Sequence, residues 1–402
     1  MNSSLSAAVC RAFALRFPPP AFARKLTDED FKNRLNIKDR RGFLQTNYWW
    51  IELAYGYEAL HDAEGLKDEL LAIAYGAWDY VKNSGKFEAE NWTLDFVGFY
   101  PAKRESRRYF GAYTLTQNDI DAATPFEDEI AYGGWPMDDH SPNDFDHGVS
   151  PNVNHKVKEP YAIPYRCLYT EELANLAFAG RNISATHMAM SSTRVMATCG
   201  LMGHAVGTAA SLAKKYGVGF GGVLAHMDEL KQALRDDDCY LLYTPRQSSA
   251  LIREAECNLT EEKRGRLLFG IGRSFKEDNA LSLAKGEPLT FTFTPTHVGR
   301  IRLLFDSDIA RVCQPIRDLR MYPQRYALAK DEPKTFVPPA LVRAYTVTVV
   351  TEDGETLTFK DRENISRLVF LPVDRRLTSI TFVGEETYGA EDVRLFSLDV
   401  TE

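Results

Sequence analysis

The sequence predicts a mixed fold, α+β or α/β, followed by an antiparallel β-sandwich, and the main reason is a change of hydrophobic spacing along the chain. Up to about residue 245, apolar residues recur at the spacing of amphipathic helices, whereas beyond about residue 250 they alternate with polar residues, as in half-buried strands. The 402 residues, 44% of them hydrophobic, are enough for two or three domains. We therefore expect one domain over residues 1–245 and the sandwich over residues 255–402.

The first domain is expected to contain helices and a few short strands. Apolar residues recur at helical spacing over residues 49–60 and again over 66–81, and a third helix with one apolar stripe is expected within 222–242. Strands are expected over 94–100 and 131–135, because these apolar stretches end at Pro or at a Gly-Gly pair.

The second domain is predicted from strands alone. Its apolar stretches alternate with polar residues and are separated by turn signals, with no helical pattern between them, which is typical of a sandwich. Asp353-Gly354 is a strong hairpin signal between two of the strands. The predicted strands begin at residues 289, 300, 345, 356, 367, 379 and 393.

Charge and composition exclude several classes of function. A net charge of −8 argues against nucleic-acid binding, which needs a basic patch. No apolar run approaches the roughly 18 residues that span a bilayer, and residues 1–20 lack the basic start of a signal peptide. The six cysteines contain no CxxC pair, so free thiols are expected instead of a zinc site or a dense disulfide framework. The compartment is left unknown.

A short strand, a glycine turn and a helix form the most informative pattern in the chain. Residues 176–179 predict a buried strand, and Gly180 follows where the backbone must turn close to a ligand without a Cβ in the way. A helix is expected to begin near residues 194–198. Its first amides have no partner within the helix, and the positive end of its dipole attracts negative charge.

Three glycines lie along one face of that expected helix. Gly200, Gly203 and Gly207 recur at spacings of three and four residues. Because glycine inside a helix costs roughly 0.5–1 kcal/mol relative to alanine, such a face indicates close packing against a sheet or a cofactor. The alternative is a small-residue helix that packs only on its neighbours.

This pattern resembles the C-terminal signature of FAD-dependent oxidoreductases with a glutathione-reductase-type fold. The resemblance covers residues 17–242 and includes Trp49-Trp-Ile-Glu-Leu, Arg104-Glu-Ser-Arg-Arg and Ile130-Ala-Tyr-Gly-Gly-Trp-Pro-Met-Asp-Asp-His, in the family's order. It implies a partial FAD-binding and substrate domain, FAD as the cofactor, and hydride transfer from a hydroxyl- or amine-bearing carbon of a small molecule to the flavin. The residues implied to contact FAD are Gly180, Arg181, Arg194, Val195, Met196, Thr198, Cys199 and Gly200.

The resemblance also points to catalytic residues. His187 and Arg107 lie in the stretches most similar to the family, and His140 follows a third such motif. A histidine can take a hydroxyl proton as hydride leaves the adjacent carbon, and an arginine can bind a carboxylate or stabilise reduced flavin. Arg108 and Arg166 are alternatives for the second role. The competing interpretation is that these histidines are structural and that the arginines form ion pairs with nearby acids.

Residues 138–160 are rich in Asp, Asn, Pro and His, so a long functional loop is expected there. Its histidines and aspartates could bind a metal or support chemistry unrelated to flavin, but they form no recognisable metal-binding or nucleophile motif, and no metal is predicted. The residues considered are His140, Asp144, Asp146, His147 and His155.

The chain contains no G-x-G-x-x-G loop between a strand and a helix, which is where the FAD pyrophosphate normally binds. Two hypotheses follow, and enzyme activity of these residues alone is left open. In the first, the chain is an FAD-dependent oxidoreductase that is incomplete alone and is completed by an FAD-binding chain or by a second copy. In the second, it is a non-catalytic remnant whose sandwich, which resembles galactose-binding-like or discoidin-like modules, binds a carbohydrate or a partner. A substrate related to sugars would suit either hypothesis.

Overall fold

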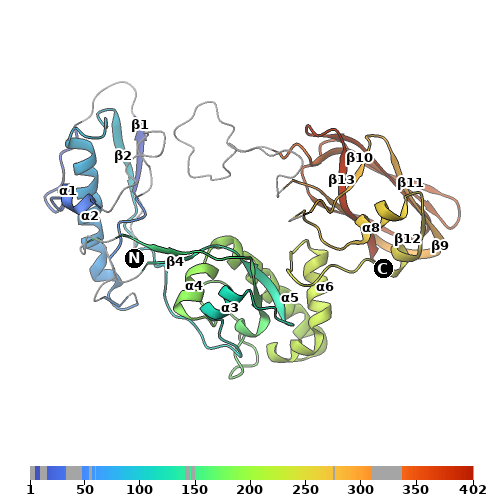
Figure 1. Ribbon diagram of the computed structural model, residues 1–402, viewed down its shortest axis with the longest axis horizontal. Helices are drawn as coiled ribbons and strands as arrows, with labels where there is room; N and C mark the ends of the chain where they lie inside the picture. The colour runs from blue at the N-terminus through green and yellow to red at the C-terminus, as the bar shows by residue number, and fades with distance from the viewer. Residues whose placement is uncertain are drawn as a thin grey trace. The chain divides into compact units, whose positions relative to one another are not determined.

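The computed structural model describes residues 5–9, 16–32, 48–53, 57–58, 60–140, 145, 150–274, 277–308 and 337–401. The chain divides into two compact units, and the division falls between Leu224 and Ala225 (Figure 1). Helices and short strands make up the first unit, whereas one large antiparallel sheet dominates the second. The predicted fold class is therefore confirmed. The domain boundary predicted between residues 245 and 255 stays a prediction.

The first unit begins with a helix packed beside a two-stranded sheet. Helix α2 (Ala63–Asn83) is the helix predicted over 66–81, and β1 (Leu5–Val9) pairs antiparallel with β2 (Trp92–Val97). The short α1 (Asp28–Phe31) lies against them through Phe31, which stacks on Tyr80 of α2 with ring centroids 4.2 Å apart. Lys82 connects helix to sheet, because its Nζ donates to the carbonyls of residues 89, 90 and 92 at 2.6–2.7 Å.

An aromatic core fills this part of the unit, and it explains why the helix predicted over 49–60 is wrong in its described part. Residues 49–53 form a turn and an isolated bridge instead of a helix. Trp50, Ile51 and Leu53 are all buried, with 1% exposure or less. A helix would direct consecutive residues to different faces, whereas this irregular segment lies within the core and buries nearly every side chain. Trp50 stacks on Phe145 with centroids 6.2 Å apart.

The rest of the first unit, as far as it is described, contains two small antiparallel pairs of strands and three α-helices, two of them consecutive. β3 and β6 form one pair, β4 and β5 form the other, and the long helix α5 packs against β3. The hairpin of β4 and β5 lies where a long loop was predicted. The elements are α3 (Gln117–Ala122), β3 (Glu129–Gly133), β4 (Met137–Asp139), β5 (Val153–His155), β6 (Tyr161–Pro164), η2 (Tyr165–Cys167), α4 (His187–Thr193), α5 (Met196–Tyr216) and η3 (Phe220–His226).

Two features of the glycine-turn region differ from the prediction. The strand expected over 176–179 is reduced to an isolated bridge between Tyr169 and Ala177, and Leu176 is 38% exposed. An apolar run of four residues is too short to specify a strand when no neighbouring strand is available to pair with it. Helix α4 was not predicted. Thr186 caps it, with its side chain accepting a hydrogen bond from the amide of Ala189, and Thr is a favoured N-cap residue.

The second unit is a β-sandwich preceded by three short helices. Its sheet has the strand order β11-β10-β12-β9-β13-β8, and β7 pairs with β9. Strands β9 and β12 are long and shift register at bulges, so each continues from one part of the sheet into the next around one apolar core (Figure 1). The elements are α6 (Met227–Asp236), α7 (Ala250–Glu254), β7 (Glu256–Cys257), α8 (Glu261–Leu268), β8 (Leu281–Leu283), β9 (Pro288–Phe305), β10 (Val342–Thr351), β11 (Thr356–Asp361), β12 (Leu368–Thr387) and β13 (Val393–Thr401).

These strands contain every strand predicted after residue 288. The predicted pair at 289 and 300 is fused into β9, and the pair at 367 and 379 is fused into β12. The hairpin at Asp353-Gly354 connects β10 to β11, and Gly354 has the positive φ of 85° that favours glycine in such turns.

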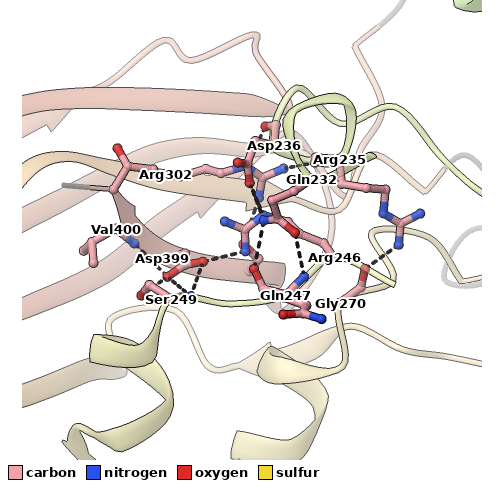
Figure 2. Close-up of polar contacts among 12 residues, drawn as sticks. Gln232, Arg235, Asp236, Arg246, Gln247, Ser249, Gly270, Arg302, Asp399 and Val400 are labelled. Atoms are coloured by element: carbon pink, nitrogen blue, oxygen red, sulfur yellow. Dashed lines mark hydrogen bonds and ion pairs between the residues drawn. The ribbon is translucent and has the colours of Figure 1, made fainter. Parts of the chain in front are cut away.

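A buried arginine network fixes α6 to the sheet within the second unit (Figure 2). Arg302 is fully buried on β9 and donates to the carbonyls of Arg235 and Asp236 and to Ser397 Oγ, at 2.8–3.2 Å. Arg246 bridges the carboxylates of Asp236 and Asp399 at 2.7 and 2.5 Å. Burial lowers the pKa of Arg302 to about 10, and its hydrogen bonds replace the water that it loses.

The cavity beside this network is small. Its volume is about 20 Å³, and Arg235, Arg246, Arg273 and Arg302 contribute to its lining. About 10–15 Å³ is enough for one water molecule, so the cavity has room for water but not for a sugar ring.

No single helix in the described part of the chain is long and apolar enough to cross a membrane. Helices α4 and α5 meet the length and composition criteria only as a pair, and that pair is bent by 93°.

Candidate functional site

The candidate site is built where the segment containing Arg104 to Tyr113 crosses the loop that precedes α4. Tyr109 donates its amide to the carbonyl of Asn182, and Leu115 donates to Ser184, at 3.0 Å each. Gly111 allows this crossing, because a Cβ there would lie 2.8 Å from the Arg166 carbonyl oxygen. The crossing places the Arg-rich motif directly beside the start of α4.

The predicted FAD-contacting residues meet at the start of α5. Gly180 has φ 112°, and a Cβ built on it would lie 3.9 Å from Cys199 Sγ, so the glycine turn and the helix are adjacent. Arg181 donates to the carbonyl of Lys103. These contacts connect the glycine turn to the helix and to the Arg-rich segment.

The N-terminus of α5 is uncapped. Its N-cap residue is Val195, which has no side-chain acceptor, and valine is a poor N-cap residue. The first hydrogen bond of the helix backbone is donated by the amide of Cys199 to the carbonyl of Val195, at 2.9 Å. Met196 is 89% exposed, and Thr198 is buried. The first turn therefore has no capping side chain, and an exposed thioether lies at its first position.

The glycine face of α5 is open. Within the part of the chain that the structure describes, a Cβ added at Gly200, Gly203 or Gly207 would meet no atom within 4 Å. Helix α5 packs on β3 through its other face, where Met202 and Ala209 are buried. Among the described residues the glycines therefore pack against no sheet. Packing against a cofactor stays a prediction, as does the alternative of a small-residue helix that packs only on its neighbours.

Arg194 lies between α4 and α5 and is largely buried. Its Nη2 donates to the carbonyl of Asp138 on β4 at 2.7 Å and lies 3.7 Å from the carboxylate of the same residue. Burial lowers the pKa of the Arg194 guanidinium from its ordinary value. These contacts attach the start of α5 to β4, so Arg194 orients the predicted cofactor site from inside the protein.

His140 is held between two carboxylates, an arrangement of Glu52, His140 and Asp138 that we call the His140 clamp. Nδ1 lies 2.7 Å from Glu52 and Nε2 lies 3.0 Å from Asp138. The His140 side chain is 9% exposed. Burial disfavours its charged form, but the two carboxylates prevail and raise the pKa of His140 above its ordinary value. Arg104 completes the cluster through Glu52.

His187, the first residue of α4, is held in the same way by Glu105 and Asp139, and we call this arrangement the His187 clamp. Nδ1 lies 2.7 Å from Glu105 and Nε2 lies 3.0 Å from Asp139. The His187 side chain is 46% exposed. The hydrogen bond to Glu105 outweighs desolvation and, together with Asp139, raises the pKa of His187 to about 9. His187 is therefore an imidazolium at neutral pH, with both ring nitrogens bonded.

The arginines of this region differ in their partners. Arg108 donates to Glu105 at 2.8 Å and to the carbonyl of Ala185. Arg166 makes a bidentate pair with Asp128 at 2.9 and 3.0 Å. Arg107 is exposed, and the described residues provide it with no hydrogen-bond or ion-pair partner. The ion-pair interpretation therefore applies to Arg108 and Arg166, and Arg107 remains available for a ligand.

The loop after β4 provides no metal site among the residues that the structure describes, where no group of three or more metal-ligating side chains converges. The nitrogens of His140 are bonded to carboxylates, and His155 is exposed on β5. Asp144, Asp146 and His147 lie outside the described residues.

The uncapped helix, the glycine turn and the clamped histidines all lie in the first unit, which is joined in sequence to a β-sandwich. The comparison with protein families names the family. The model of the FAD dependent oxidoreductase family matches residues 12–234, more than half of the chain, and the chain belongs to that family.

The other comparisons concern curated proteins and solved structures. No curated protein matches the chain. The family 32 carbohydrate-binding module of Streptococcus pneumoniae EndoD is 13% identical at a TM-score of 0.26, over 38% of this chain and 99% of the module. Chitosan-binding module 1 of a Paenibacillus sp. IK-5 chitosanase/glucanase is 14% identical at 0.25, over 39% and 100%. A GH31 CBM32-2 bound to GalNAc is 9% identical at 0.25, over 39% and 95%. Because the sequence identities and TM-scores are this low, none of the three modules bears on the function of this chain.

FAD is the cofactor of this family. The chain fits the flavin in part. The uncapped amides of α5 can donate to a polar ring edge, and Gly180 leaves the adjacent turn without a Cβ. Thr193 Oγ1, three residues before α5, is buried without a hydrogen-bond partner among the described residues. For the pyrophosphate, the sequence contains no G-x-G-x-x-G loop between a strand and a helix: the match at residues 217–222 follows helix α5 and runs into η3.

Proposed function

We propose that this chain provides the flavin-facing and substrate-facing part of an FAD-dependent oxidoreductase, and that a segment outside these 402 residues binds the FAD pyrophosphate. The observation that carries the proposal is the start of α5, where uncapped amides and an open glycine face adjoin the glycine turn. Amides at a helix start without a capping side chain can donate to a ligand, and glycines with no neighbouring atom leave room for one to approach the backbone.

Bound FAD would accept hydride from a hydroxyl- or amine-bearing carbon of the substrate. The amides of α5 would hold the ring edge on which negative charge develops. His187 and Arg107 are placed to meet the substrate because both are exposed, whereas His140 is buried and would orient β4. To remove a substrate proton, His187 would first have to lose its proton and release Asp139 or Glu105, since both its nitrogens are bonded.

Flavin absorbance tests the proposal directly. Purified protein is titrated with FAD and the spectrum from 300 to 550 nm is recorded, before and after gel filtration. We expect a saturable change in the flavin band that gel filtration removes, because the ring site is present and the pyrophosphate loop is not. An unchanged spectrum at millimolar FAD would show that α5 is not a flavin site. Full retention of flavin through gel filtration would show that no further segment is needed.

A proline substitution identifies which amides are used. Met196→Pro removes one amide at the first helical position, where proline is well tolerated. It should weaken FAD binding several-fold and leave the far-ultraviolet circular dichroism unchanged. Glu261→Pro, at the first position of α8 in the second unit, is the matched control and should leave FAD binding unchanged.

The alternative, a non-catalytic protein that binds carbohydrate or a partner through its sandwich, remains a prediction. Among the described strands of the sandwich, no aromatic side chain is strongly exposed. The most exposed large apolar residue among the described residues of the second unit is Ile365, at 72%, between β11 and β12. A protein that stays colourless at all FAD concentrations and binds an immobilised glycan would favour this alternative.

A further inference from the structure

Arg107 differs from the other arginines beside the two clamps in what it contacts. Arg104 pairs with Glu52, Arg108 with Glu105, and Arg194 with Asp138. Each of these guanidinium groups is committed to holding the protein together. Arg107 lies two residues after Glu105 and immediately before Arg108, is exposed, and has no described partner.

Among the described residues, the four carboxylates of the two clamps all have cationic partners other than Arg107. The four acids of the clamps are matched by three arginines and by two histidines, and both histidines have a raised pKa. Arg107 adds a further positive charge to this region, and no carboxylate of the clamps is paired with it. The chain as a whole has a net charge of −8, so this local positive charge is not a property of the surface in general.

The residues on either side of Arg107 are bonded to the segment that contains the predicted site. Glu105 bonds to His187, Arg108 donates to the carbonyl of Ala185, and Tyr109 donates to that of Asn182. Arg107 is thus fixed on both sides, by bonds to the segment that contains the glycine turn and the start of α4. A guanidinium held on such a backbone can bind a carboxylate in bidentate geometry with little loss of conformational freedom.

We propose that Arg107, two residues after the Glu105 that binds His187, binds the carboxylate of an anionic substrate, so that the substrate class is a hydroxy or amino acid whose oxidised carbon lies near that carboxylate. That the bound acid is oxidised rests on the proposed function. Binding of the anion by Arg107 does not, because it is expected of the chain without FAD. The FAD pyrophosphate is also an anion that an arginine could bind, and the test separates the two.

The test uses the full chain without FAD and follows the side-chain nitrogen signals of His187 and of arginine by NMR. Glycolate, a hydroxy acid, should shift the His187 signals in a saturable manner. Ethylene glycol, its uncharged analogue, should not. Arg107→Ala should weaken glycolate binding roughly tenfold or more, as expected for a hydrogen bond to a charged group. Arg107→Lys should recover part of the affinity, because it keeps the charge without the bidentate fork.

Two controls make the result decisive. Arg375→Ala removes another exposed arginine, in the second unit, and should leave glycolate binding unchanged. Inorganic pyrophosphate serves as the probe for the cofactor's anion. If Arg107→Ala weakens pyrophosphate but not glycolate, or if glycolate leaves His187 unshifted, the proposal is wrong. Because FAD is absent, either outcome is independent of the flavin titration that tests the proposed function.

Discussion

The His140 clamp and the His187 clamp have the same chemistry and differ in burial. In both, Nδ1 lies 2.7 Å from a glutamate and Nε2 lies 3.0 Å from an aspartate, and the two aspartates are neighbours on β4. The exposed fraction of the histidine side chain is 9% in the first and 46% in the second. The same hydrogen bonds therefore stabilise the fold in one place and present a charge to solvent in the other.

This difference follows from what covers each clamp. Glu52 comes from the irregular segment that lies in the aromatic core, so its clamp is enclosed. Glu105 comes from the Arg-rich segment, and its side chain is partly exposed. His187 is the first residue of α4, and its side chain is partly exposed as well. A histidine between two carboxylates is therefore not in itself evidence for catalysis. The exposed fraction of the histidine side chain is what distinguishes the structural His140 clamp from the candidate site at His187.

The largest expected effect is on the free energy of unfolding, and it should differ between variants of the two clamps. Glu52→Ala leaves His140 and Arg104 without their shared carboxylate in a buried setting, which should cost roughly 3 kcal/mol. Glu105→Ala, the matched change at the surface, should cost about 1 kcal/mol or less. Urea unfolding followed by tryptophan fluorescence measures both, because all five tryptophans lie before residue 136, in the first unit. Equal losses in the two variants would contradict the distinction by burial.

A smaller effect concerns the extra donor in the buried clamp. Asn152 donates to Asp138 at 2.5 Å, and with His140 it holds the pKa of Asp138 down at about 2 despite burial. Asn152→Ala should destabilise the first unit by about 1 kcal/mol, the usual contribution of one hydrogen bond, and should raise the pKa of Asp138. Carboxyl carbon NMR and the same urea titration measure the two effects. Asn154→Ala removes an exposed asparagine of β5 whose side chain has no hydrogen-bond partner among the described residues, and it is the control.

The smallest expected effect is the pH dependence contributed by His187. Because the pKa of His187 is raised from 6.5 to about 9 in the folded protein, its stabilising contribution is complete below pH 6.5 and is lost as the pH rises toward 9. The wild type should therefore lose more stability than His187→Gln between pH 6.5 and 9.5. Urea midpoints at the two pH values, compared between the proteins, isolate this contribution from groups common to both. A parallel decrease in both proteins would mean that His187 is not clamped in solution.

The long, strongly periodic elements could be predicted from the sequence, but several short ones could not. Helix α2 and the strands of the sandwich follow apolar spacing, because each buries one face against a core. The segment around Trp50 repeats the same residue types at helical spacing, yet it lies within an aromatic core and forms no helix in its described part. Helix α4 has too few residues for a periodic signal, and only its cap at Thr186 could have indicated it.

The candidate site was predicted as a set of residue types, and the contacts between them were not. The motifs around Arg104, His140 and His187 were identified separately, but that each histidine sits between two acids depends on residues up to 88 positions apart. Arg107 and Arg108 are adjacent and chemically identical, and only their partners distinguish them. No local pattern specifies which of two neighbouring arginines will meet a distant carboxylate.

The sequence by itself determined the family, the sandwich and the absence of a Gly-rich phosphate loop, because these depend on periodicity and on motifs that are local in the chain. Only the tertiary structure decided that the glycine face of α5 is open, that His140 is buried and His187 accessible, and that Arg107 has no described partner. The physical reason is that burial and charge pairing are properties of segments brought together from distant parts of the chain, and they determine which of several similar side chains can meet a ligand.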